Sequence, residues 1–419
     1  MKLILVCICI LIFTLGINDA QTNDTASQNR HVIYPFIIQD SPARLFSMRQ
    51  FDEDYLSTYR LISNTLNRDF KPVVSYLIQA SGYILLFGPL THEEGHRSIL
   101  VSKNIGSISQ PFFLSLRGGY ISGVTDQTLQ NIRDTDFPDF IRLHTAGLES
   151  DFMLNHRVEN LLSFEDESYK NIAIEYILRK FSLMEYYLIG FFHYDVDGAE
   201  EKDELKRDIV GNDVYGVIRH LYRPKMEYRR YTQYKDLTPE EKKYVAKMGY
   251  KSFFNLLNPN ILGIYNLRIT NNLRMNLGMG HTMCPFGDFT DENLWIKYND
   301  ILKIHIYTRQ YQNRSNWFPA GGIEFLDLPF TKRFEASCGL HLWNQPENLG
   351  FNDSRGKMGG AAELLGKYYF VTRHKTRLDK ISIDLGINYK TIGFLPEEIY
   401  LRKHFGFRIG TSIGLDQIL

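Results

Sequence analysis

The spacing of apolar residues divides this chain into two parts of different character. From about residue 262 onward, apolar and polar residues alternate in short segments separated by turns, as in 302–307 and 381–385. Alternation with period two is typical of β-strands, and this rule predicts roughly six to eight of them. The part before residue 261 is mostly helical in pattern. The sequence therefore predicts an α+β protein, with a mostly helical domain over 21–260 and an antiparallel β domain over 261–419, built as a sheet or a small barrel.

Local signals place individual elements within the helical part. Residues 32–38 are predicted to form a short strand near its beginning. A helix is expected to begin at Pro239, because Thr238 is a good capping residue and Glu241 follows three residues later. This helix should end near Asn258, where a proline follows.

An uncharged run covers residues 72–91. It is just long enough to cross a bilayer as a helix, which takes roughly 20 residues. Its polar positions, Ser75 and Gln79 among them, suit a helix packed against other helices better than one facing lipid, so we favour a buried core helix. Gly88 and Pro89 are expected to break or kink this helix before the segment that follows.

That following segment carries the most specific motif of the chain, Thr91-His92-Glu93-Glu94-Gly95-His96-Arg97. It matches the pattern H-E-x-x-H. On a helix, His92 and His96 lie one turn apart on the same face, where two imidazoles can hold one zinc ion. Glu93 is then placed to act as the general base toward a water molecule.

A simpler interpretation competes with the metal site. Thr91 is a good N-cap and Glu94 falls three residues later, so the segment also fits a capping box at a solvated helix start. However, two His, two Glu and an Arg directly after an apolar run need water, partners or a metal ion. We favour the metal site on this ground.

A third ligand is expected from a later helix. The best source is the segment 143–151, in which Glu149 lies among small and apolar residues. We predict Glu149 as the third zinc ligand and name His144 as the alternative. The charged segment 195–208 lacks the spacing of a calcium loop and is interpreted as solvated surface.

The N-terminus predicts export. Lys2 precedes an apolar core, and Ala20 stands at a plausible cleavage position, so residues 1–20 are interpreted as a signal peptide, with a retained membrane anchor as the alternative. In the mature chain Cys284 and Cys338 remain. They form either one disulfide or two free buried thiols.

Overall composition excludes one class of partner. Lys and Arg together number 48, as do Asp and Glu, so the net charge is zero. A general nucleic-acid binder needs a basic excess, and we therefore expect no nucleic-acid partner. Aromatic residues make up 14% of the chain, which favours β-structure or surface at a membrane interface.

The segment His92-Glu93-Glu94-Gly95-His96 resembles the motif of zincin-type zinc metallopeptidases. Gly95 before the second histidine and the apolar helix around the motif are also similar to site-two-type membrane zinc proteases. The signal peptide and the aromatic-rich strands resemble envelope proteins of Gram-negative bacteria. These resemblances imply Zn²⁺ as the cofactor, a peptide or protein as the substrate, and a location in the periplasm or the outer membrane.

The function predicted from the sequence is zinc-dependent peptide hydrolysis in the cell envelope, with Glu93 as general base. Membrane association is left open. The alternative is a non-enzymatic envelope or outer-membrane β-domain protein, in which the H-E-x-x-H segment is structural or accidental. A further alternative keeps the zinc but gives it four protein ligands and a structural role.

Overall fold

The computed structural model describes residues 31–110, 119–193, 195, 200–372 and 378–416. The predicted signal peptide, 1–20, lies outside these residues. The helices are α2 Met48–Asp69, α3 Pro72–Gly82, η1 Tyr83–Phe87, α4 Gly88–Ser102, α5 Asp126–Thr135, α6 Phe137–Ser163, α7 Tyr169–Phe191, η3 Glu204–Lys206, α8 Asp213–Tyr222, η4 Tyr234–Asp236, α9 Pro239–Ser252, η5 Phe253–Leu256 and η6 Pro259–Leu262.

Two sheets contain the strands. The small sheet pairs β2 Ile108–Gln110 with β3 Tyr120–Ser122. The large sheet contains β1 His31–Ser41, β4 Leu267–Arg268, β5 Leu273–Cys284, β6 Gly287–Tyr298, β7 Leu302–Gln312, β8 Trp317–Thr331, β9 Phe334–Pro346, β10 Gly356–Thr372, β11 Leu378–Lys390 and β12 His404–Asp416.

The large sheet has ten antiparallel strands in the order β1-β12-β11-β10-β9-β8-β7-β6-β5-β4. The α+β prediction is therefore confirmed. Within the described residues the sheet is open, because β1 and β4 form its two edges, so the small barrel that the sequence left as an alternative is wrong. Strands β4 to β12 all come from the region that was expected to be rich in strands.

Strand β1 links the N-terminal part of the chain to this sheet. The strand expected at 32–38 is present, and it pairs with β12 so that Tyr34 lies opposite Ile413. The segment before the helices is thus part of the same sheet as the C-terminal strands. Alternation alone cannot identify the partner of a strand, and the pairing of β1 was not foreseen.

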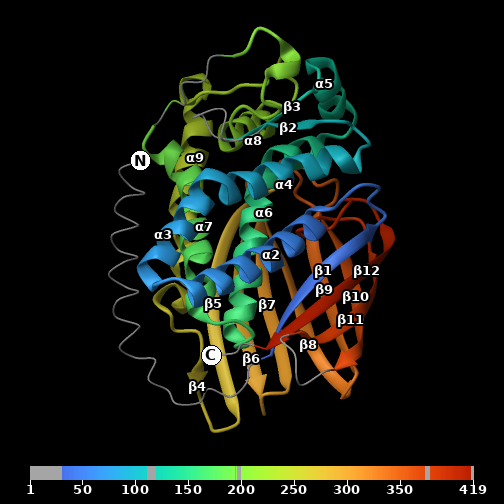
Figure 1. Ribbon diagram of the computed structural model, residues 1–419. Coiled ribbons are helices and arrows are strands. Elements are labelled where there is room, and N and C mark those ends of the chain that lie inside the picture. Colours follow the sequence, from blue (N-terminus) through green and yellow to red (C-terminus); the bar gives the residue numbers. More distant parts are fainter. Residues whose placement is uncertain (1–30, 111–118, 194, 196–199, 373–377, 417–419) are drawn as a thin grey trace.

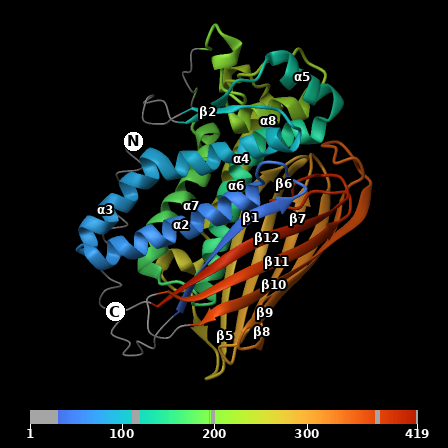
Figure 2. The ribbon, with the colours of Figure 1, turned by 45° about the vertical axis from the view of Figure 1, so that its right-hand side comes forward.

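The long helix α6 connects the helices to the sheet. Figures 1 and 2 show α6 between the outer helices and the concave side of the strands. Phe152 of α6 packs edge-on against Phe289 of β6 at 5.2 Å between ring centroids. One hydrophobic cluster includes Leu148 and Phe152 together with Met283 and Tyr311, so helices and sheet share a core.

Helices α3, η1 and α4 follow one another without a break, so of the predicted break or kink at Gly88 and Pro89 the break does not occur. Instead the turn before Pro89 is a π-helix. Proline clashes with the carbonyl four residues earlier, and a π-turn widens the helix at that point, which lets the chain continue.

The stretch Pro72–Ser102 is the one helical span among the described residues that is long and apolar enough to cross a membrane by length and composition. Of its most apolar window, 28% is buried. From the sequence we favoured a buried core helix for this stretch. The low buried share of its most apolar window does not agree with that prediction.

Two local predictions have clear outcomes. Helix α9 begins at Pro239, and its capping box is formed, with the Thr238 hydroxyl accepting from the Glu241 N–H at 3.3 Å. Cys284 and Cys338 are both free thiols. Of the two alternatives for these cysteines, a disulfide and two free thiols, the structure therefore has the two free thiols.

Candidate metal centre

Helix α4 brings the two motif histidines together. The Nε2 atoms of His92 and His96 lie 3.2 Å apart. Close packing of α4 on α6 depends on two glycines: a Cβ on Gly95 would lie 2.5 Å from the carbonyl oxygen of Ala146, and a Cβ on Gly147 would lie 2.4 Å from His92 Nε2. The glycine between the motif's glutamates and its second histidine is thus required by the contact between the helices.

Thr91 does not cap a helix start. It lies inside the continuous helix, where its hydroxyl donates to the carbonyls of Phe87 and Gly88, both at 3.0 Å. The same hydroxyl accepts from Arg179 Nη1 at 2.8 Å. The capping-box interpretation of this segment is therefore wrong, and the histidines sit in the interior of the helix rather than in its first turn.

A carboxylate that the sequence analysis did not select completes the group. Asp213 is the first residue of α8, and its Oδ2 lies 2.8 Å from His92 Nε2 while its Oδ1 lies 3.5 Å from His96 Nε2. Burial alone would raise the pKa of Asp213, but the two histidines lower it well below its ordinary value. His92, His96 and Asp213 form a group that could hold a metal ion.

The Nδ1 atoms of both histidine rings, which point away from the group, lie within hydrogen-bond distance of acceptors. His92 Nδ1 lies 2.8 Å from Asp151 Oδ2, and Asp151 Oδ1 in turn accepts from Arg179 Nη1 at 2.5 Å. His96 Nδ1 lies 2.6 Å from the carbonyl oxygen of Leu143. Such supporting hydrogen bonds fix the ring orientation of metal-binding histidines and raise their basicity.

The three side chains together can hold a positive charge. His96 Nδ1 faces the carbonyl oxygen of Leu143, so a neutral His96 carries its hydrogen on Nδ1 and its lone pair on Nε2. Both nitrogens of His92 face a carboxylate at 2.8 Å, Asp151 at Nδ1 and Asp213 at Nε2, which favours a protonated ring. A proton there, or a metal ion in its place, offsets the repulsion between the acceptors of this group.

Two further carboxylates lie beside this centre. Burial, together with the charges of Asp208 and Asp213, raises the pKa of Glu93 well above its ordinary value, while His92 opposes this. Burial also raises the pKa of Asp208 to about 6, and Asp213 adds to this shift. Asp208 belongs to the segment that was interpreted as solvated surface; most of the described residues of this segment are exposed, and Asp208 itself is half-buried.

Glu149, the predicted third ligand, does not lie with the histidines. It is fully buried and binds Arg142 through both oxygens, at 3.0 and 2.7 Å. Its Oε1 also accepts from the backbone N–H of Glu397 at 2.7 Å. The reason is helical phase: Leu143, Gly147 and Asp151, four residues apart, face α4, and Glu149 points elsewhere.

His144, the alternative ligand, lies close to the centre but outside it. Burial lowers the pKa of His144 to about 4, so its ring is neutral near pH 7. The ring packs edge-on against Phe140 at 4.9 Å between centroids. A Cβ on Gly216 of α8 would lie 2.8 Å from His144 Nδ1. The residue thus helps α8, and with it Asp213, to dock on α6.

Asp151→Asn should lower the metal affinity of the centre by about 10–100-fold, because the amide removes the negative charge that supports His92. Isothermal titration with zinc measures this, at a temperature where thermal melting shows both proteins folded. The matched control is Asp134→Asn, which neutralises an exposed carboxylate on α5 and should bind zinc as wild type does. An unchanged affinity for Asp151→Asn would show that Asp151 does not support a ligand.

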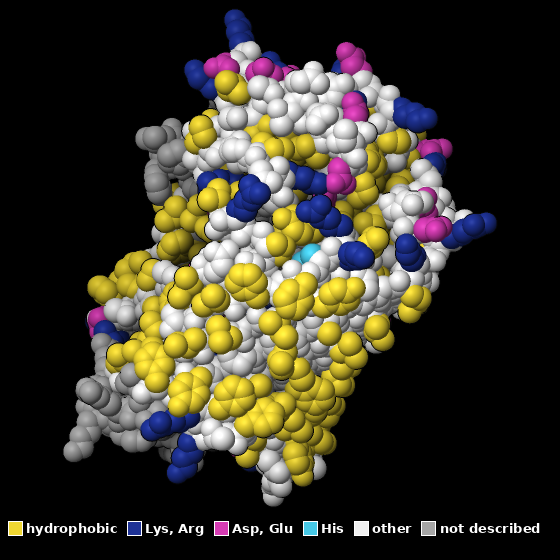
Figure 3. Space-filling model, turned by 90° about the vertical axis from the view of Figure 1, so that its right-hand side faces the viewer, with side chains coloured by type: hydrophobic (Ala, Val, Ile, Leu, Met, Phe, Trp, Pro, Cys, Tyr) yellow, Lys and Arg dark blue, Asp and Glu magenta, His cyan; other side chains and the backbone are white. Residues whose placement is uncertain are grey.

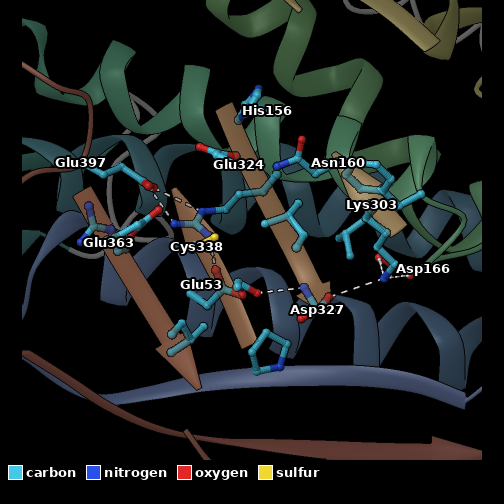
Figure 4. A pocket seen from close by; sticks show the side chains of 18 of the residues that line it. Glu53, His156, Asn160, Asp166, Lys303, Glu324, Asp327, Cys338, Glu363 and Glu397 are labelled. Atoms are coloured by element: carbon cyan, nitrogen blue, oxygen red, sulfur yellow. Dashed lines mark hydrogen bonds and ion pairs between the residues drawn. The ribbon is translucent and has the colours of Figure 1, made fainter. Parts of the chain in front are cut away.

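A large cavity, with many charged residues among those that line it, lies away from this centre, between α6 and the sheet. Its volume is about 590 Å³. Figure 4 shows His156 and Asn160 of α6 on one wall and Glu324 and Glu363 on the strands opposite. His341 also lines it, and two overlapping groups around Glu324 could hold a metal ion: His156, His305 and Glu324, and Glu324, His341 and Glu363.

Comparison with protein-family models, with curated proteins and with solved structures gave no match. The function must therefore be argued from the geometry of the centre and from the chemistry of its residues.

Proposed function

We propose that this protein is a zinc-dependent peptide hydrolase with a metal centre formed by His92, His96 and Asp213. The observation that supports this best is the convergence of the two Nε2 atoms, 3.2 Å apart, on one carboxylate. Two imidazole nitrogens bound to one zinc ion in tetrahedral geometry are about 3.3–3.4 Å apart, given Zn–N distances of about 2.0–2.1 Å. Little movement is needed to reach that separation.

The types of the three side chains at the centre are those found in catalytic zinc sites. Two histidines and one carboxylate are a common set of protein ligands in catalytic zinc sites, which keep a further position for water or substrate. The same set suits iron(II). We infer zinc because the histidines belong to the H-E-x-x-H motif, and elemental analysis of the purified protein decides between the two metals.

Zinc bound there would supply a Lewis acid that polarises a carbonyl and acidifies water. The chain's own contribution is made by Glu93, which accepts a proton from the attacking water and passes it to the leaving amine nitrogen. Burial raises the pKa of Glu93 above its ordinary value, which makes its carboxylate a stronger base than an exposed glutamate. Tyr186 stacks flat on His92, 4.5 Å between ring centroids, and holds the ring in place.

Metal content tests the proposal directly. We expect about one zinc ion per mature chain, residues 21–419, lost in His92→Ala, in His96→Ala and in Asp213→Ala. Asp134→Ala, which removes an exposed carboxylate, should keep the metal. A folded wild-type protein that takes up no metal after zinc is added would contradict the proposal.

Zinc affinity should rise steeply with pH. Burial alone would lower the pKa of His92, but its hydrogen bonds with Asp151 and Asp213 raise it well above the ordinary value, so the metal-free ring holds its proton more tightly than an ordinary histidine does. Zinc must displace that proton. We expect the apparent affinity to increase about tenfold per pH unit from pH 6 to 8, measured by competition with a chelator of known affinity. A flat profile would show that no proton is displaced.

A structural metal site is the second candidate function, with Asp208 as the residue to test as a fourth protein ligand. The charge of His96 lowers the pKa of Asp208, while the ligand atoms that lie within 4.8 Å of one another belong to His92, His96 and Asp213. If Asp208 is a fourth protein ligand, Asp208→Asn should release the metal. If the centre is catalytic, the same variant should keep its metal and change the pH profile of hydrolysis.

A further inference from the structure

The outer face of the large sheet is apolar and uncovered. In β11 the outward residues Ile383, Leu385, Ile387 and Tyr389 are each at least half exposed, between 50% and 58%. Antiparallel sheets of water-soluble proteins have the reverse arrangement, with apolar residues toward the core and polar residues toward water. The neighbouring strands repeat the pattern, through the exposed residues Leu340, Leu342, Leu364, Tyr368, Phe405, Phe407 and Ile409.

The inner face of the same strands is polar. Asp384 of β11 accepts hydrogen bonds from Ser382 and Ser412, both at 2.5 Å. Lys367 of β10 donates at 2.8 Å to Asp327, which Figure 4 shows at the cavity. Strands with polar residues inward and apolar residues outward are typical of membrane-embedded β-structure.

The acidic side chains on this side of the molecule lie mainly in its upper half (Figure 3). Figure 3 shows hydrophobic side chains over most of the lower half, whereas Asp and Glu gather in the upper half. Exposed cations stand at the end of the sheet where β10 and β12 begin: Arg355, Lys357, Arg402 and Lys403. Such residues at the edge of an apolar band are suited to anionic lipid headgroups.

We propose that a lipid bilayer covers the outer face of β9 to β12, with its headgroups at the end of the sheet that carries Arg402 and Lys403. Strands of membrane β-structure are tilted, and a tilted strand takes about 9–11 residues to cross the hydrocarbon layer. The apolar outward run of β11, 381–389, covers nine residues. The length of the run is therefore sufficient for the hydrocarbon layer.

A second exposed apolar surface favours a bilayer over a second copy of the chain. Helix α3 lies on the opposite side of the molecule from β10 to β12 (Figures 1 and 2) and exposes Val73 at 67%, Leu77 at 53% and, in the adjoining turn, Leu85 at 64%. A symmetric dimer covers one self-complementary patch on each copy. Lipid surrounds a protein and covers both surfaces at once.

The test is flotation of the mature chain, residues 21–419, with vesicles of zwitterionic phosphatidylcholine. We expect the wild type to float with the vesicles, and the triple variant Leu340→Arg, Leu385→Arg, Phe407→Arg to lose at least about 30-fold in partitioning. The matched control places three arginines in the polar upper part, at the exposed positions Gln127, Asn131 and Leu205, and should float as wild type does. Equal flotation of both triple variants would overturn the proposal.

A second measurement holds even if the triple variant folds poorly. A nitroxide at Leu385→Cys, in a Cys338→Ala background, should collide with dissolved oxygen and be shielded from a water-soluble nickel reagent in vesicles. The same label at Leu205→Cys should respond in the opposite way. Strong access of the nickel reagent to position 385 would overturn the bilayer. A detergent-free dimer that buries position 385 would also overturn it, in favour of a second copy. Neither result bears on the metal centre.

Discussion

Glu93→Gln is expected to keep its zinc and to lose turnover by about 10²–10⁴-fold, the usual contribution of a general base. The carboxamide has nearly the shape of the carboxylate but cannot accept the proton of the attacking water. The three predicted ligands are untouched, so the metal content should stay at the wild-type level. Turnover of a casein-derived fluorogenic peptide and elemental analysis of the same sample measure both quantities.

Glu94→Gln is the matched control for this experiment. Glu94 is the neighbouring glutamate of the motif, and it binds Arg97 at 2.9 Å and the hydroxyl of Ser109 instead of facing the histidines. Its replacement should leave turnover within a few-fold of wild type. Equal turnover of Glu93→Gln and wild type would remove Glu93 from the mechanism, whereas equal loss in both variants would point to a general effect of charge.

Glu149→Ala and Asp213→Ala are expected to have opposite effects on folding stability and on zinc binding. Glu149 is the ligand predicted from the sequence, and Asp213 is the carboxylate that lies beside the histidines in the structure, so the comparison tests which of the two binds zinc. Glu149→Ala leaves the buried guanidinium of Arg142 without its partner, which typically costs about 3–5 kcal/mol of folding stability. The folded fraction should still bind zinc. Asp213→Ala should lose zinc, with a smaller effect on the stability of the metal-free protein.

Chemical denaturation of the metal-free proteins and zinc content of the folded fractions measure these two outcomes. The double variant Arg142→Met, Glu149→Leu serves as the control, because replacing both partners of a buried ion pair by apolar residues is often close to neutral. It should regain most of the stability that Glu149→Ala loses. Loss of zinc from folded Glu149→Ala would restore Glu149 as a ligand and would contradict the placement of Asp213.

Much of the fold follows from local patterns. Alternation identified the strands after residue 262, and the signals at Thr238 and Pro239 placed the start of α9 correctly. The same patterns could not show that β1 joins β12, since strand pairing over such a separation depends on how the whole sheet assembles. Alternation also gives two faces for each strand without saying which one meets the core. In β11 the structure turns Asp384 inward and Leu385 outward.

At the candidate centre, the sequence by itself placed His92 and His96 on one face of a helix, because residues four apart are neighbours on any α-helix. It also supplied Gly95, whose missing Cβ lets α4 approach α6. The spacing of the two histidines is a local property, and no other part of the chain is needed for it.

Only the tertiary structure decided which carboxylate meets the two histidines. Glu149 and Asp151 are both acidic residues of α6, yet the rotation of α6 against α4 turns Asp151 toward His92 and Glu149 toward Arg142. Asp213 reaches the centre because α8 docks on α6 beside His144. The rotation and the docking of helices are set by the packing of their whole surfaces, and therefore no short motif contains them.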